Sequence, residues 1–254
     1  MHIVVPVKLV PDLVEELVMD ESGAALDASA VRLVLSEFDD HAIEQAILLK
    51  ERSGGQVTVV APAVEGADEV LYTAAAKGAD RLVRLTNDFE RGMNNHGLAR
   101  ALAEVLKTLQ PDLVLTGVQA HDDLDGSLGP LLAEYCGMPY VGYVAGLALA
   151  EGKAVARKEY PGGLAAEMEI TLPAVLGIQA AERPPRYVAV SKVRQAMKTA
   201  TIAETRVAGL EPGGGPAITR LFLPEAGRQA VMIEGSVEEI AARLVAIFKE
   251  LGLL

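Results

Sequence analysis

The sequence has a single cysteine, Cys136, among its 254 residues. One cysteine cannot form a disulfide within the chain and excludes a cysteine-rich metal site. No apolar run approaches the roughly 20 residues that a membrane-spanning helix needs, so we expect no membrane embedding. Residues 1–5 enter a strand-like run directly, without a basic leader region. Together these absences predict a cytoplasmic location.

Positive charge is also scarce, with 23 Lys and Arg against 35 Asp and Glu and a formal net charge of −12. Neutralising a phosphate backbone requires clustered Lys and Arg, so we expect no nucleic-acid surface. The four histidines are scattered, and no metal site is expected. Half of the residues are hydrophobic, which favours a packed core over disorder.

Several common catalytic motifs are missing. The first strand is not followed by G-x-G-x-x-G, and neither G-x-x-x-x-G-K-[ST] nor G-x-S-x-G occurs. Catalysis by a familiar nucleophile or metal is therefore unsupported. We expect a chain that is not an enzyme by itself and has no catalytic residues of its own.

Strand-like runs alternate with helical patterns along most of the chain, and this alternation predicts an α/β fold with a mostly parallel sheet and helices on both faces. A helix over 37–52 is opened by Ser36 with Asp39 three residues on, and it carries one apolar stripe. The predicted strands cover residues 2–7, 57–60, 82–85, 113–115 and 172–178. The other predicted helices cover 68–77, 98–109 and a stretch from about 126.

After Met138 the rhythm changes. Two extended segments, 153–158 and 165–171, flank a Tyr-Pro-Gly-Gly turn and predict a hairpin. A Gly/Pro-rich linker, 211–216, precedes an amphipathic helix with the capping box Ser236 and Glu239. We therefore predict an α/β domain over 1–190 and a C-terminal extension over 191–254 that packs on a partner.

The most informative segment is the polar loop 117–130, which follows a strand and opens a helix. Open α/β sheets bind ligands at this carboxyl edge, and the helix N-terminus would offer N–H groups near Gly126 and Ser127 to a phosphate. The alternative is that Asp125 simply caps the helix and the acidic run is a solvated turn. His121 could contact a nucleotide or face solvent. The cluster 39–41 resembles an acid/base site, but as a first helical turn it also fits the helix dipole.

Several short motifs occur together in a characteristic order. They are Val5-Pro6-Val7-Lys8, Phe38 with Ile43-Glu44-Gln45-Ala46, Thr73-Ala74 with Gly78-Ala79-Asp80, Gly117-x-Gln119-Ala120-x-Asp122-Asp123, Gly162-Gly163, Leu172-Pro173-Ala174-Val175 and Pro185-Arg186-Tyr187. In this order and spacing the chain resembles the electron transfer flavoprotein beta subunit, from the first strand to about residue 198.

The resemblance implies an adenine-nucleotide α-hydrolase-like sheet that buries a structural AMP and walls one side of an FAD held mainly by an alpha subunit. Pro6 would lie beside the adenine, Phe38 would approach the flavin, and the loop after Gly117 would hold ribose and phosphate. The implied cofactor-binding positions are Pro6, Ser36, Glu37, Phe38, Asp39, Pro62, Gly117, Gln119, Ala120, His121, Asp122, Asp123, Gly126, Ser127 and Leu128.

The resemblance also implies partners: the alpha subunit in a heterodimer, acyl-CoA or other flavin dehydrogenases, and a membrane quinone oxidoreductase or other acceptor. Glu159 would steady the flavin domain, and the segment 187–198 would form the loop that grips dehydrogenases. The implied partner-binding positions are Glu159, Arg186, Tyr187, Val190 and Lys198. Leu128 departs from the family pattern because it has no donor for a phosphate, and Val190 replaces a leucine anchor.

Two alternatives remain open. The loop ending 127–130 resembles the electron-bifurcating branch of the family, which puts a second FAD in the AMP site, whereas Asp122 and Asp123 resemble the AMP type. An adenine-nucleotide sensor resembling universal stress proteins is the other alternative. The hairpin, the linker and the C-terminal helix are extra to so small a sensor.

Overall fold

The computed structural model describes residues 1–87, 94–123, 127–150, 152–208, 214–215, 218–224, 227 and 230–254. Its largest feature is a nine-stranded sheet in the order β11-β5-β4-β1-β6-β10-β7-β8-β9. The seven strands from β11 to β7 are parallel, and β8 and β9 continue the sheet antiparallel. The strands are β1 (His2–Pro6), β4 (Gln56–Pro62), β5 (Arg81–Asn87), β6 (Leu113–Gly117), β7 (Tyr140–Ala150), β8 (Lys153–Tyr160), β9 (Leu164–Thr171), β10 (Ala174–Ile178) and β11 (Ile202–Val207).

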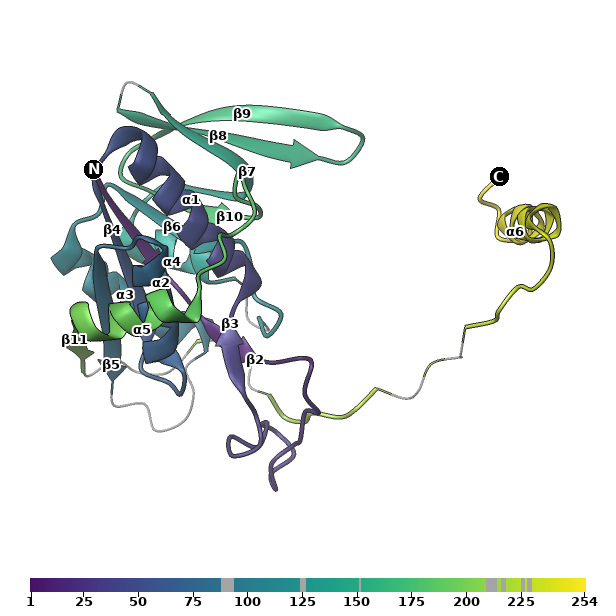
Figure 1. Ribbon diagram of the computed structural model, residues 1–254, viewed down its shortest axis with the longest axis horizontal. Helices are drawn as coiled ribbons and strands as arrows, with labels where there is room; N and C mark the ends of the chain where they lie inside the picture. The colour runs from purple at the N-terminus through teal and green to yellow at the C-terminus, as the bar shows by residue number, and fades with distance from the viewer. Residues whose placement is uncertain are drawn as a thin grey trace. The chain divides into compact units, whose positions relative to one another are not determined.

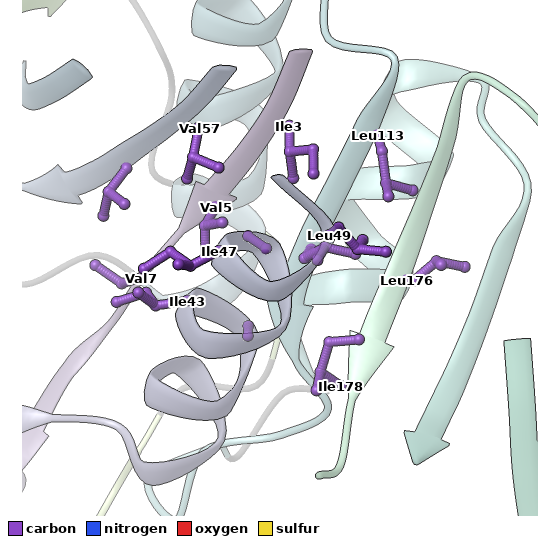
Figure 2. Close-up of a cluster of buried hydrophobic side chains, with 14 of the residues drawn as sticks. Ile3, Val5, Val7, Ile43, Ile47, Leu49, Val57, Leu113, Leu176 and Ile178 are labelled. Carbon is purple, nitrogen blue, oxygen red and sulfur yellow. The ribbon is translucent and has the colours of Figure 1, made fainter. Parts of the chain in front are cut away.

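Alternate residues of the parallel strands supply two separate cores, because successive side chains of a strand point to opposite faces. In β1, Ile3 and Val5 pack with α1 (Glu37–Ser53) and α2 (Ala67–Lys77). Figure 2 shows Ile3, Val5 and Val7 beneath Ile43 and Ile47 of α1. Val4 instead packs with α3 (Asn95–Leu109) and α4 (Leu128–Cys136). The predicted α/β class, with helices on both faces of a mostly parallel sheet, is confirmed.

The predicted hairpin is also confirmed. Strands β8 and β9 pair from Lys153 with Thr171 to Tyr160 with Leu164, and Figure 1 shows them as a long ribbon at one end of the sheet. The sequence pattern did not predict a second, two-stranded sheet, in which β2 (Leu9–Pro11) pairs with β3 (Leu33–Leu35). It also did not predict α5 (Val190–Thr199), which packs against α2.

Two helix starts differ from their predicted form. Ser36 is the N-cap of α1, but its hydroxyl makes no capping bond, and the Asp39 carboxylate is engaged elsewhere, as described below. The helix predicted from about residue 126 begins at Leu128 with Ser127 as its N-cap, so the predicted cap at Asp125 is wrong. Asp125 itself and Gly126 lie outside the described residues.

The chain divides into two compact units, Met1–Arg220 and Leu221–Leu254. Of the predicted linker 211–216, only Gly214 and Gly215 lie within the described residues. The second unit contains α6 (Val237–Glu250), whose start has the predicted capping box of Ser236 and Glu239. No residue of α6 is buried. Among the helices in the described ranges, none is long and apolar enough to cross a membrane. The predicted boundary at 190/191 stays a prediction.

Candidate functional site

The strand order creates a switch point between β1 and β6. From β1 the chain proceeds outward through β4 to β5, then crosses back to place β6 on the other side of β1. Connections that leave two neighbouring strands in opposite directions leave room for a ligand at their carboxyl ends. Pro6 ends β1 and Gly117 ends β6 at this edge, and Pro62 ends the adjacent β4. The structure therefore brings three of the predicted positions to one edge.

Asp39 connects the two strands at the switch point. Its carboxylate accepts one hydrogen bond from the backbone N–H of Lys8 and another from that of Gly117, both 2.7 Å long. The side chain is buried, and burial raises the pKa of Asp39 to about 7 even though both N–H groups favour its ionised form. Asp39 thus lies in the first turn of α1 but serves as a bridge between β1 and β6.

Gly117 allows this close approach. A Cβ atom at this position would lie 2.6 Å from Asp39 Oδ1, 2.8 Å from Phe38 Cβ and 2.9 Å from the Asp39 nitrogen. These distances are shorter than van der Waals contact, so only glycine lets the start of α1 pack onto the end of β6. The glycine is therefore required by packing and leaves a bare backbone surface at the ligand edge.

A charged network orders the loop after β6. The Lys8 ammonium lies 2.8 Å from Asp122 Oδ1 and 2.8 Å from Asp123 Oδ1. Asn95, buried at the start of α3, donates to Asp123 Oδ1 at 2.6 Å, and the Ala120 N–H donates to the other Asp123 oxygen at 2.8 Å. Burial opposes the charge on Lys8, but the two carboxylates outweigh it and raise the pKa of its ammonium. Lys8 thus remains charged and compensates the acidic loop.

The other predicted positions on this edge have mixed surroundings. Phe38 is half-buried, and Glu37 and Gln119 are exposed. The exposed His121 ring makes a 2.9 Å hydrogen bond to the Pro11 carbonyl through Nε2, which ties the loop to β2. One of the two earlier interpretations of His121, a plain solvent-facing ring, is thereby narrowed to a surface ring with a structural contact.

The start of α4 fits a phosphate through its backbone. Ser127 makes no side-chain capping bond, so the N–H groups of the first turn have no side-chain acceptor and remain suited to an anion. The Leu128 side chain is buried in the core between α3, α4 and the sheet, so only its backbone could serve a ligand. The donors at this position are therefore main-chain groups and the Ser127 hydroxyl.

Comparison with known proteins agrees with this geometry. Residues 24–210 match the family described as "Electron transfer flavoprotein domain". The chain belongs to the electron transfer flavoprotein beta-subunit family. A relative from Methylophilus methylotrophus, named "Electron transfer flavoprotein subunit beta", is 36% identical over 98% of both chains. Relatives with the same name from Syntrophomonas wolfei and Clostridium acetobutylicum are 32% identical over 90% of this chain and 88% of theirs, and 31% identical over 98% of both.

The positions that the family resemblance assigns to partners lie in three places. Glu159 is exposed on β8 and pairs with Arg157 at 3.1 Å. Tyr187 and Val190 are exposed at 89% and 61%, and Lys198 lies in the last turn of α5. These three places are far apart in the sequence, and their partner roles stay predictions.

Arg186, the remaining partner position, makes its contacts within this chain. Its guanidinium binds Glu44 at 2.8 Å and Glu51 at 2.6 Å, and its backbone N–H donates to Glu44 at 3.0 Å. Both acids lie on α1, and Glu44 is buried. In this member of the family Arg186 therefore fastens the segment before α5 to the first helix.

Two residues of the site were not singled out by sequence reasoning. Lys8 appeared only within a family motif, and Asn95 did not appear. One usable signal was the pair Asp122 and Asp123 on a loop next to a buried sheet edge, since buried carboxylates require a nearby cation or several donors. The spacing along the chain could not identify those donors, because they come from 114 and 28 positions away.

Proposed function

We propose that this chain is the beta subunit of a heterodimeric electron transfer flavoprotein. It would bind AMP at the β1–β6 edge and wall one side of an FAD held mainly by an alpha subunit. The complex would carry electrons from acyl-CoA or other flavin dehydrogenases to a membrane quinone oxidoreductase or another acceptor. The names of relatives that match almost the whole chain support the subunit assignment.

The observation that carries the nucleotide part is the combination at the switch point. Gly117 leaves bare backbone at the end of β6, and the first turn of α4 has no side-chain cap. Lys8 neutralises part of the acidic loop in between. Backbone donors beside a compensated loop suit the sugar and phosphate of a nucleotide.

The chain's own residues would bind and position rather than react. Asp39 is occupied by two backbone N–H groups and Lys8 by two carboxylates, so neither is free to act as a base or nucleophile. When bound, FAD would supply the redox chemistry, and the protein would contribute orientation, exclusion of water and nearby charge. This is the division of labour expected of an electron carrier.

The proposal is tested by co-purifying the chain with the product of its neighbouring gene, denaturing the complex and counting FAD and AMP per heterodimer. One FAD with one AMP is the expected result. Two FAD without AMP would replace the AMP assignment with electron bifurcation. A homodimer that carries nucleotide but neither flavin nor partner would contradict the subunit assignment and favour a stress-protein-like sensor.

A further inference from the structure

Arg100 lies in the second turn of α3, away from the nucleotide edge described above. Its Nε and Nη2 atoms are buried and have no hydrogen-bond acceptor in the described part of the chain. The guanidinium carbon lies 5.8 Å from the centre of the Tyr135 ring on α4. The acid one helical turn further along α3, Glu104, is paired with Lys107 instead. Arg100 is thus a cation with an aromatic neighbour and no carboxylate.

Tyr135 and His96 complete a small cluster around this cation. The Tyr135 hydroxyl is 3.3 Å from His96 Nδ1, and 38% of the tyrosine is exposed. The ring is therefore held between α3 and α4 while one side faces solvent. The stacked ring fixes the plane of the guanidinium, which preorganises its donors for a planar partner.

An arrangement of this kind is costly for the chain alone. A buried donor without an acceptor loses about 1 to 3 kcal/mol, and more when the group is charged. A cation–π contact at a partly exposed position returns only about 0.5 to 1 kcal/mol. The chain carries 35 acidic residues yet places none on Arg100. An acceptor supplied from outside the chain accounts for this.

The surroundings favour an acceptor attached to another protein. The cluster lies on the open α3–α4 face, where no described donor other than Tyr135 and His96 joins Arg100 to surround a small anion. The segment that leads toward α6 passes over the same cluster: Asn94 donates to the Gly214 carbonyl, and a Cβ at Gly214 would lie 3.0 Å from His96 Cβ. Farther along, α6 presents exposed Val237, Leu244 and Phe248 with no buried residue. A covering partner would therefore continue from this face along the extension.

We propose that Arg100, oriented by Tyr135 and His96, is a docking site for a carboxylate side chain of the alpha subunit. This inference rests on the heterodimer proposed above. A carboxylate matches the guanidinium fork with two parallel hydrogen bonds and would satisfy the donors that the chain leaves unpaired. Arg100 is then an interface anchor whose partner lies in the other subunit.

The test uses the co-purified complex and measures how fast this chain exchanges with a tagged copy. Arg100→Met keeps a flexible stem on the Tyr135 ring and removes the donors. We expect exchange about 30-fold faster than wild type, since loss of one member of a buried ion pair acts mainly on the dissociation rate. Arg100→Lys retains the charge but loses the fork, and should be intermediate. Arg81→Met, which removes an exposed arginine on β5, is the matched control and should exchange at the wild-type rate.

A second measurement separates docking from a structural role. Urea unfolding of the full-length chain alone should show Arg100→Met at least as stable as wild type, because an uncompensated cation has been removed. Wild-type exchange in both Arg100 variants, or a less stable Arg100→Met chain with normal exchange in Arg100→Lys, would overturn the inference. So would inorganic phosphate that stabilises the wild-type chain but not Arg100→Met, because the acceptor would then be a soluble anion. Failure of the wild-type heterodimer to form would instead contradict the proposed function.

Discussion

At the residue scale, the nucleotide edge depends on a few atoms that are both structural and exposed to a ligand. Asp39 holds the ends of β1 and β6 together, and Gly117 lets α1 approach β6 closely enough for that bridge to form. Lys8 joins through its backbone to Asp39 and through its ammonium to the loop acids. Binding and stability are therefore coupled at this site, and changes to it should first be measured as changes in stability.

Gly117→Ala should destabilise the chain by about 1 to 3 kcal/mol, because the added methyl group would overlap Asp39 and Phe38. The measurement is the free energy of unfolding in urea. Gly146→Ala on β7 is the matched control, since its Cβ would meet Arg157 Cβ at an ordinary 3.5 Å. Equal stability of the two variants would show that α1 does not press on β6 as described.

Asp39→Asn should change how stability depends on pH. The folded-state pKa of Asp39 is raised to about 7 from an ordinary 3.8, so the folded chain binds the extra proton between these values. This contribution to stability is complete below pH 3.8 and is lost as pH rises through about 7. Asn cannot titrate and can accept only one of the two N–H bonds, so the variant should be less stable by about 1 to 3 kcal/mol at pH 5.

The difference between wild type and Asp39→Asn should then narrow by about 2 kcal/mol between pH 5 and pH 8. Urea unfolding at each pH unit measures it. Asp68→Asn, which alters a half-exposed carboxylate paired with Arg84, should show no such narrowing over this range. Parallel curves for wild type and Asp39→Asn would mean that Asp39 is ionised throughout.

At the element scale, periodicity predicted the elements that have one clear buried face. Helix α3, with buried Leu98, Leu102 and Val105, and the hairpin β8–β9 have such faces. The pattern did not reveal α5, because only Ala196 is buried in it. It also did not reveal β11, whose Ile202–Val207 alternates with Glu and Arg and resembles a polar connection. For the site, residue types placed the loop correctly, but the pairing of Asp39 with Gly117 spans 78 positions and depends on the tertiary fold.

The connection between α1 and the segment before α5 gives the element-scale prediction. Arg186→Lys should lower the free energy of unfolding by roughly 1 to 2 kcal/mol, because lysine keeps the charge but cannot bind Glu44 and Glu51 together. The hydrogen bond from Arg186 holds the pKa of Glu51 below its usual range, so this part of the stability is present near neutral pH and is lost in acid. Arg52→Lys, opposite the more exposed Glu182, is the control and should cost less.

At the scale of the whole molecule, the first unit contains both cores and the entire nine-stranded sheet, whereas α6 in the second unit buries none of its residues. An amphipathic helix gains most of its stability from the surface on which its apolar face packs. The exposed apolar residues of α6 therefore favour a role in contacting another chain rather than in holding this one together.

A chain that ends at Arg220 should accordingly retain the fold. We expect its unfolding midpoint in urea to equal that of the full chain within error, because the removed residues cover no part of either core. The same truncation should weaken the heterodimer at least tenfold, measured by subunit exchange, since it removes the apolar face of α6 from the interface. A matched variant, Ser236→Ala in the full chain, breaks the capping box and should weaken the heterodimer by a smaller factor. If the truncated chain unfolded more easily while the heterodimer stayed intact, α6 would have to pack on its own sheet, and the extension would be part of the fold rather than part of the assembly.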